Sequence, residues 1–351
     1  MITITIKDIA KAAKVSTATV SYVINGTRPV MPEKRQRVLD VIKQTGYQPN
    51  IVAKNLRTKK TNTIGVMVED VMSFSTPGIV DGLYEYMENT DYHILLNDLR
   101  MMDSLFNKYD QVVNQKVKIH RVLSYLNYGT KVDAIIYIGM FDRDITGILE
   151  DINKPMVIAY SVSRDDHTCF VTYENEAICA QVARYLIAEG HRNIAVITGL
   201  AHTAPAQLRF NGFKGALDEA GIPLHSHFIK NGNWERESGY HCMKELLENE
   251  VKPTAVFAMN DLMAIGAMEA IHDAGLSIPN DISVIGFDNQ AVSDFVSPRL
   301  TTVEIDLKAI GFSAAQMVIE QLESKERHTG NRKIIVPSKM IHRSTVKNLI
   351  V

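Results

Sequence analysis

The chain has 351 residues, of which 46% are hydrophobic and 22% are charged, and this balance is that of an ordinary globular protein. Its length suggests two or three compact units rather than one small core. No apolar run approaches the roughly 20 residues that span a bilayer, and the charged N-terminal segment lacks the apolar stretch of a secretory signal. Three widely spaced cysteines argue against a disulfide framework or a zinc site. We therefore expect a cytoplasmic protein without a metal or other cofactor.

Charge is unevenly distributed along the chain. Residues 1–60 contain twelve Lys and Arg and three Asp and Glu, which gives a net charge of +9. The remainder contains 26 Lys and Arg and 37 Asp and Glu, which gives a net charge of −11. A basic segment attached to an acidic body is typical of a module that binds a polyanion. A merely solvated basic surface is the alternative, so the pattern of apolar and polar residues has to decide.

Three short helices are predicted in the basic segment. The first, over residues 6–13, has apolar residues at i, i+3, i+4 and i+7 and is preceded by Thr5 as its N-cap. The second follows after about three residues, over 17–24, with Ser16 as its cap. The third, over 32–45, begins with proline, which is favoured in a first turn. Two short helices joined in this way form a helix-turn-helix.

The second helix of a helix-turn-helix lies in the major groove, and its first turn touches base edges. Thr17 and Ser21 are able to hydrogen-bond bases or phosphates, Ala18 suits a thymine methyl group, and Tyr22 suits either contact. A plain three-helix bundle without a DNA role is the alternative, and the net charge and the small polar residues argue against it. With the capping residues included, the predicted DNA contacts here are Thr5, Ser16, Thr17, Ala18, Thr19, Ser21, Tyr22 and Asn25.

A family resemblance is carried by two runs, TIKDIAKAAKVSTATVSYVINGTRPV and GYQPNIVAKNLRTKKTNTIGV. They resemble the headpiece and hinge of the LacI/GalR family of bacterial repressors, and the likeness continues through essentially the whole chain. It implies a helix-turn-helix domain at 1–48, a hinge helix and linker at 49–61, and an effector-binding and dimerisation domain at 62–351. It also implies a homodimer that binds a near-palindromic DNA operator.

The resemblance further implies a hinge helix too short to be stable alone, which orders on DNA beside its twin. Leu56 matches the leucine that wedges into the minor groove, although an ordinary linker residue packed on the body is the alternative. Tyr22 stands where members often carry arginine or histidine, so no operator sequence carries over. The predicted hinge contacts are Asn50, Ala53, Leu56 and Arg57.

After residue 61, short apolar runs alternate with longer helical patterns, which indicates parallel sheets covered by helices on both faces. The fold class is therefore α/β, and the resemblance implies a two-lobe body like that of periplasmic sugar-binding proteins, crossed three times by the chain. The lobes are expected at about 62–162 with 305–332 and at about 163–302 with 335–347. The predicted strands are 63–68, 93–97, 134–139, 155–159, 193–198, 254–258 and 283–287, and helices are predicted at 176–188, 209–220, 237–248 and 261–274.

Ligands of such sheets bind beyond the carboxyl ends of the strands. The resemblance implies that Arg209, opening the helix of an RxxGF motif, and Asp288, in VIGFDN, contact an effector on which Trp234 stacks. Asn260 completes a set that suits a sugar ring, and Phe74 lies near the ligand loop of the first lobe. The alternatives are an interlobe salt bridge for Arg209, a helix cap for Asp288 or Asn260, and a core position for Trp234. The effector is expected to be a saccharide or a derivative.

Enzyme signatures are absent from the sequence, which has no GxGxxG, GxxxxGK[ST] or GxSxG motif. His191, His202 and His241 are not at metal-ligand spacing. We therefore expect a transcription regulator rather than an enzyme. A solute-binding protein of a transport system, using the same two-lobe body, is the alternative, and the basic headpiece argues against it.

Overall fold

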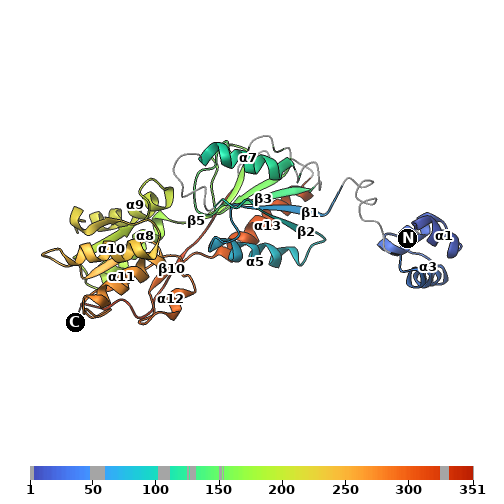
Figure 1. Ribbon diagram of the computed structural model, residues 1–351. Helices are drawn as coiled ribbons and strands as arrows, with labels where there is room; N and C mark the ends of the chain where they lie inside the picture. The colour runs from blue at the N-terminus through green and yellow to red at the C-terminus, as the bar shows by residue number, and fades with distance from the viewer. Residues whose placement is uncertain are drawn as a thin grey trace. The chain divides into compact units, whose positions relative to one another are not determined.

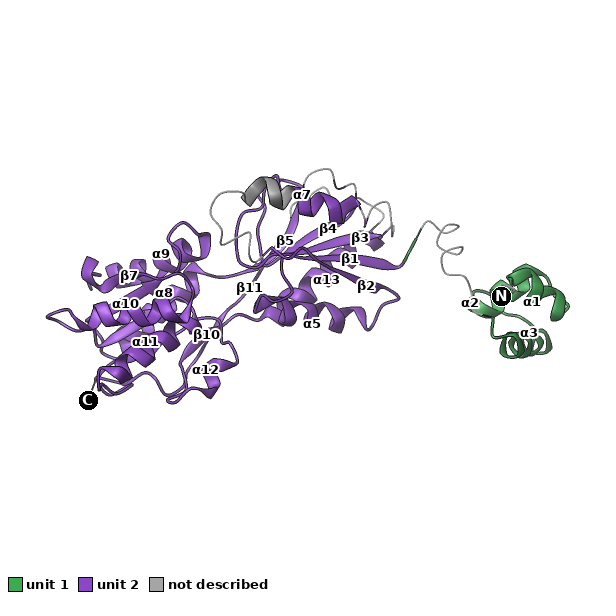
Figure 2. Ribbon diagram, in the orientation of Figure 1, with its two compact units in different colours: residues 1–61 green, residues 62–351 purple. Residues whose placement is uncertain are grey.

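A computed structural model describes residues 4–47, 60–101, 111–124, 126, 132–149, 152, 154–324 and 332–350, with the backbone alone for 111–116. The chain divides into two compact units, residues 1–61 and residues 62–351 (Figure 2). The small unit is hereafter called the headpiece and the large unit the body. Each contains its own hydrophobic core.

The headpiece is a bundle of three helices, α1 (Ile6–Ala12), α2 (Thr17–Asn25) and α3 (Pro32–Thr45) (Figure 1). One apolar residue or more from each helix is buried, because each has an apolar face directed at the other two. The helix-turn-helix prediction is confirmed. The core consists of Ile9, Ala10, Ala13, Val20 and Val38.

Local signals determine where these helices begin and end. Before α1, the backbone nitrogen of Thr5 donates to Asp8 Oδ2 at 2.9 Å, which satisfies one of the N–H groups left over at a helix start. Before α2, Ser16 Oγ accepts from the backbone nitrogen of Thr19 at 3.1 Å. Gly26 ends α2 in the left-handed conformation with φ of 65°, which glycine adopts without strain.

Lys14, in the turn between α1 and α2, also has a left-handed backbone, with φ of 54°. The backbone nitrogen of Val15 donates to the carbonyl oxygen of Ala10 at 3.0 Å, a bond typical of a left-handed helix end. Glycine is the usual residue at such a position, and a side chain costs about 1–2 kcal/mol there. The chain therefore keeps a lysine where glycine would relieve strain.

A six-stranded parallel sheet with the order β11-β5-β4-β3-β1-β2 forms the first lobe of the body. Alternate residues along a strand face opposite sides, so Val66 packs in one core cluster and Met67 in another. The first cluster lies beneath α5 (Ser75–Met87) and α13 (Leu307–Glu323), and the second beneath α7 (Gln111–Ser124) on the opposite face (Figure 1). The strands are β1 (Thr63–Val68), β2 (His93–Asp98), β3 (Ala134–Ile138), β4 (Met156–Ala159), β5 (Cys169–Tyr173) and β11 (Lys333–Val336).

A four-stranded parallel sheet with the order β7-β6-β8-β9 forms the second lobe. Its helices pack in two pairs, α8 with α9 and α10 with α11. The first pair approaches closely at Gly212, where an added Cβ would lie 1.9 Å from the carbonyl oxygen of Glu176. The remaining bounds are β6 (Ile194–Thr198), β7 (Ile229–Asn231), β8 (Ala255–Ala258), β9 (Ser283–Ile285), β10 (Thr302–Glu304), β12 (Lys339–Ile341), α8 (Glu176–Ala188), α9 (Ala204–Glu219), α10 (Arg236–Leu247), α11 (Asp261–Asp273), α12 (Val292–Phe295) and the 3₁₀ turn Ser226–Phe228.

The chain passes between the sheets after β5, before α13 and after β11, so the two-lobe α/β fold is confirmed. The predicted lobe limits require a correction. Residues 163–173 were expected in the second lobe, but Cys169 pairs with Val157 in the first sheet. Residues 335–336 belong there too, because Ile335 pairs with Thr172. β5 is the strand after which the chain leaves the first lobe, and β11 is a short strand far from its partner β5 in the sequence, so the local pattern does not reveal which sheet receives them.

Candidate functional site

The outer face of α2 carries most of the side chains predicted to contact DNA. Thr17, Ala18 and Asn25 are exposed, whereas Ser21 and Tyr22 are half-buried. Asn25 Nδ2 donates to the carbonyl oxygen of Ser21 at 2.8 Å and to Ser21 Oγ at 3.2 Å. Ser21 and Asn25 therefore hold each other in place, while the first turn presents a hydroxyl and a methyl group to solvent.

Tyr22 has a cationic neighbour on the headpiece surface. Arg28 Cζ lies 5.3 Å from the centroid of the Tyr22 ring, and such a contact contributes about 0.5–1 kcal/mol at an exposed site. The contact orients the tyrosine ring and places a positive charge beside α2.

Three of the predicted contacts also build the helix ends. Thr5 Oγ1 donates to Asp8 Oδ2 at 2.7 Å, and this bond lowers the pKa of the Asp8 carboxyl. Ser16 Oγ lies 2.9 Å from Thr19 Oγ1. Of the hinge contacts, none is placed, because Asn50, Ala53, Leu56 and Arg57 lie outside the described residues.

Arg209 is the centre of a buried polar cluster in the body and is only 4% exposed. Its Nε donates to Asn175 Oδ1 at 2.9 Å and its Nη2 to the Tyr173 hydroxyl at 3.0 Å. Its Nη1 donates to the carbonyl oxygen of Met259 and lies 3.7 Å from Asp288 Oδ1. All three guanidinium nitrogens thus have partners within the protein, and the positive charge is held in the interior by hydrogen bonds and a carboxylate.

Asp288 follows β9 at a turn in which its own φ is 110°. Burial raises the pKa of its carboxyl to about 6, although the nearby Arg209 opposes the rise. The ring centroid of Phe287 lies 3.6 Å from Arg209 Cζ, so the guanidinium stacks on an aromatic face beside the carboxylate. Asp288 is the N-cap of none of the described helices, and its contact with Arg209 is an ion pair within one lobe.

Trp234 and Asn260 are joined by a hydrogen bond at the same end of the second sheet. Asn260 Nδ2 donates to the carbonyl oxygen of Trp234 at 2.7 Å, and Asn260 Oδ1 caps α11 by accepting from Met263. The Trp234 ring is half-buried, and Gly199 makes room for it, because a Cβ there would lie 2.0 Å from the ring. Arg209 Cζ lies 5.7 Å from the Trp234 ring centroid. Arg209, Asp288, Trp234 and Asn260 therefore belong to one region.

Side chains of the first lobe extend this cluster. Asp142, which follows β3, accepts from Asn175 Nδ2 at 2.8 Å, and burial raises the pKa of Asp142 to about 6. The neighbouring Arg143 forms an ion pair with the buried carboxylate of Glu69 at the end of β1. Asn175 therefore binds Arg209 on one side and Asp142 on the other, and links the two lobes.

Comparison with known proteins identifies the family. The family described as bacterial regulatory proteins, lacI family, matches residues 5–50, and a periplasmic binding protein-like domain matches residues 183–346. Catabolite control protein A of Priestia megaterium is 34% identical over 324 residues, which cover 92% of this chain and 93% of that protein. The chain belongs to the lacI family. A second relative, the HTH-type transcriptional repressor PurR of Histophilus somni (strain 129Pt), is 33% identical over 346 residues, which cover 98% and 99%.

Solved structures agree with this lacI-family fold over nearly the whole length. The lac repressor dimer bound to operator and the anti-inducer ONPF has a TM-score of 0.79 at 24% identity, covering 98% of this chain and 99% of that one. The complex of the transcriptional regulator CelR with cellobiose has a TM-score of 0.66 at 24% identity, covering 97% and 99%. Together with the helix-turn-helix, the family membership makes this chain a DNA-binding transcriptional regulator.

Four of the five residues predicted to bind an effector meet in this lacI-family body, namely Arg209, Trp234, Asn260 and Asp288. Phe74 lies in the other lobe, just before α5, and is 40% exposed. One local expectation is wrong, because Arg209 does not open a helix. It lies in the middle of α9, which already begins at residue 204, where a proline in the first turn favours the start.

The predicted set omits the residues that connect the cluster to the first lobe, Tyr173, Asn175 and Asp142. Tyr160 also belongs here, because its ring stacks on that of Tyr173 with the centroids 5.0 Å apart. Tyr160 and Tyr173 each lie at the end of a strand, which is a signal that a search of all strand ends would have detected. Among the described residues, no group of three or more His, Cys, Asp or Glu is arranged to hold a metal, and no helix has the length and apolar character needed to cross a membrane.

Proposed function

We propose that this lacI-family regulator is a ligand-controlled repressor, which binds a near-palindromic operator as a homodimer and changes its DNA affinity when a saccharide binds at the Arg209 cluster. One observation carries the proposal: a single chain has an exposed helix-turn-helix face and a polar cluster that residues of both lobes build together. Its relatives, which are named as repressors and as a catabolite control protein, support the same function.

DNA reading is assigned to the first turns of α2. In a dimer, two such helices enter successive major grooves about 34–36 Å apart, which is why the operator is expected to be nearly symmetric. Ala18 offers its methyl group to thymine, and Thr17 and Tyr22 offer hydroxyls to base edges. Leu56, outside the described residues, is proposed to wedge into the minor groove, and Leu56→Ala should then weaken operator binding while leaving the headpiece folded.

A neutral saccharide suits the chemistry of the body cluster. Arg209 forms an ion pair with Asp288, and Asn175 links Arg209 to Asp142. This cluster therefore contains two carboxylates and one guanidinium group. This balance disfavours an anionic effector and favours hydroxyl groups, which donate to carboxylates and accept from guanidinium. The half-buried ring of Trp234 offers a flat face for a pyranose. A purine is the alternative, because several relatives are named PurR, and its flat ring would use the same tryptophan.

Effector binding should alter how the lobes meet. Arg209 and Asp288 are 4% and 7% exposed, so a ligand reaches them only by replacing protein contacts. Asn175 is shared between Arg209 and Asp142, and any ligand that takes over one of its bonds also disturbs the other lobe. Coupling of about 1–3 kcal/mol would give roughly 5–150-fold control of DNA affinity.

The DNA-binding part is tested by selecting duplexes from a random library with the full-length protein. The expected result is a near-palindromic motif, and Tyr22→Ala should change the preferred bases without unfolding the chain. Recovery of no sequence motif from repeated selections would contradict the proposal. A motif without symmetry would contradict its dimeric form.

The effector part is tested by thermal unfolding with a panel of neutral saccharides, sugar phosphates and nucleobases. A ligand that binds the folded state raises the melting temperature by mass action. At a concentration of 100 times its Kd it adds about 2.7 kcal/mol to the free energy of unfolding. A neutral saccharide should stabilise the wild type and stabilise Trp234→Ala much less. Stabilisation by a nucleobase and by no saccharide would overturn the proposed ligand class and leave the regulator role intact.

A further inference from the structure

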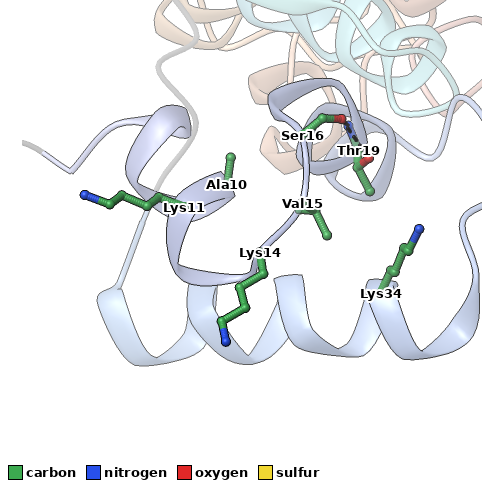
Figure 3. A pocket seen from close by; sticks show the side chains of 7 residues that line it. All are labelled: Ala10, Lys11, Lys14, Val15, Ser16, Thr19 and Lys34. Atoms are coloured by element: carbon green, nitrogen blue, oxygen red, sulfur yellow. Dashed lines mark hydrogen bonds between the residues drawn. The ribbon is translucent and has the colours of Figure 1, made fainter.

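A hollow on the headpiece surface lies beside the start of α2 and is lined by three lysines that the site predictions leave out. Lys11 comes from α1, Lys14 from the turn and Lys34 from the first turn of α3. All three side chains are exposed. The lining residues are Ala10, Lys11, Lys14, Val15, Ser16, Thr19 and Lys34 (Figure 3).

The three ammonium groups have no acidic partner among the described residues. This unit has three described acids: Asp8 accepts from Thr5, Asp40 accepts from Gln36 Nε2 at 2.9 Å, and Glu33, which precedes Lys34, forms none of the ion pairs found among the described residues. Asp8 lies near enough to Lys11 for the two charges to interact, but its carboxylate is already held by Thr5. The hollow is therefore a concentration of cationic charge that the headpiece itself does not neutralise.

The backbone of Lys14 is a second, independent observation. Its φ of 54° is a conformation that favours glycine, yet the position carries a long cationic side chain at the rim of the hollow. Stability of the headpiece alone would favour glycine here. A lysine in this strained position is explained if its charge is used by a partner.

The direction of the lysines indicates what kind of partner fits. In Figure 3 the three amine ends point in different directions rather than toward one point. A compact anion would need convergent donors, whereas a chain of phosphates offers negative charges spaced along a strand. Ser16 and Thr19 line the same hollow, and Thr17 and Ala18 of the same helical turn are exposed to read bases.

We propose that this hollow, defined by Lys11, Lys14 and Lys34 around Ser16 and Thr19, binds the phosphodiester backbone of DNA beside the bases that α2 reads. The inference rests on the proposed DNA binding and adds the residues that position the helix on the duplex. Phosphate contacts of this kind fix the register of a protein on DNA without reading sequence. The lysines should therefore contribute equally to operator and to unrelated duplexes.

The test measures binding of the full-length protein to a labelled duplex of arbitrary sequence over a series of salt concentrations. Each phosphate contact that is lost reduces the slope of log affinity against log salt by about 0.9. Changing all three lysines to glutamine should thus lower the slope by about 2.7. Lys252→Gln, an exposed lysine of the body, is the matched control and should leave the slope unchanged.

Lys14→Gly separates the proposed role from a structural one. Glycine relieves the left-handed strain, so the headpiece should melt at a higher temperature, while DNA affinity should fall about eightfold at 0.1 M salt because one counterion fewer is released. A merely structural lysine would leave DNA affinity unchanged or improved in this variant.

The outcomes distinguish this inference from the proposed function. If the wild type binds no duplex, the DNA-binding function itself fails. If the wild type binds with a steep salt dependence and the triple variant keeps the same slope, the lysine hollow is not a DNA contact. Stabilisation by inorganic phosphate at constant ionic strength, lost in the triple variant while the DNA slope stays unchanged, would assign the hollow to a small anion instead and overturn the inference.

Discussion

The headpiece around α2 and the body around Arg209 both carry cationic and polar side chains, but these are mostly exposed in the first region and mostly buried in the second. Around α2, the lysines and the Thr17 hydroxyl are exposed, whereas Arg209 is 4% exposed and has a partner on every nitrogen. A partner as large as DNA reaches only exposed groups, while a small molecule is able to replace buried contacts. The polar side chains around α2 are thus accessible to a large partner, whereas those around Arg209 are engaged with one another and join the two lobes.

Removal of the buried guanidinium should have the largest effect on stability. Arg209→Met keeps much of the side-chain volume but leaves Asp288, Asn175 and Tyr173 without their shared partner. The free energy of unfolding of the body should fall by about 3–5 kcal/mol in urea titrations. Arg184→Met is the control, because Arg184 forms an exposed pair with Glu219, and its loss should be at most about 1 kcal/mol. Equal losses in the two variants would contradict the account.

Acidification should change the free energies of unfolding of the two units in opposite directions. Burial raises the pKa of Asp142 and of Asp288 from 3.8 to about 6, and that of Asp261 to about 8, so below these values the folded body holds protons that the unfolded chain has released. Its free energy of unfolding therefore increases as the pH falls from about 7 to about 5, by about 1.4 kcal/mol for each of Asp142 and Asp288 and by more for Asp261. Asp8 has a lowered pKa, so its contribution is present at neutral pH and is lost as the pH falls below its unfolded value.

The measurement is urea unfolding at about pH 7 and about pH 5, with separate signals for the two units. The variant with Asp142→Asn, Asp261→Asn and Asp288→Asn should lose most of the pH dependence of the body in this window. An unchanged pH dependence in that variant would show that none of the three carboxyls is responsible for it.

The link between the lobes is tested by Asn175→Ala. This change leaves Arg209 Nε and Asp142 Oδ2 without their partner, which should cost about 1–3 kcal/mol. Amide hydrogen exchange over residues 139–146 should also become faster, because the loop that holds Asp142 loses its anchor. Asn193→Ala, at an exposed position, should change stability by no more than about 0.5 kcal/mol. Exchange that stays at the wild-type rate would rule out the link.

The smallest expected effects distinguish the roles of two neighbouring hydroxyl side chains of the headpiece, Ser16 and Thr17. Ser16→Ala removes the cap of α2 and should lower headpiece stability by about 1 kcal/mol. Thr17→Ala alters an exposed helical position where alanine is the better helix former, so stability should hold while DNA affinity falls. Thermal unfolding and duplex titration of both variants check this. A Thr17→Ala variant that loses stability and keeps its DNA affinity would reverse the assignment.

The helices of the headpiece were predictable because their signals are local. Ser16 lies one residue before α2, Gly26 directly after it, and a proline stands at the start of α3. Each signal acts within a few residues, so sequence order alone reveals it. The strands at 63–68 and 255–258 were recognisable for a similar reason, as continuous apolar runs that are buried on both faces.

The rest of the body was less predictable because its determining contacts are distant in sequence. Arg209 meets Tyr173 across 36 residues and Met259 across 50, and no periodic pattern encodes such pairings. The same reason explains the misplacement of residues 335–336, since β11 joins the first sheet beside β5, which is far away along the chain. Family resemblance supplied Arg209 and Asp288 as predicted site residues, whereas Asn175 was not among them, and its importance comes from the bonds it makes to both lobes.

Ligand binding in the body and DNA binding in the headpiece are proposed to be energetically coupled. The test is to measure the affinity of the stabilising saccharide for the full-length protein with and without the selected duplex. Coupling is reciprocal, so DNA should change the saccharide affinity by at least about fivefold, and by the same factor by which the saccharide changes DNA affinity. Identical saccharide affinities in the presence and absence of a saturating duplex would contradict the account.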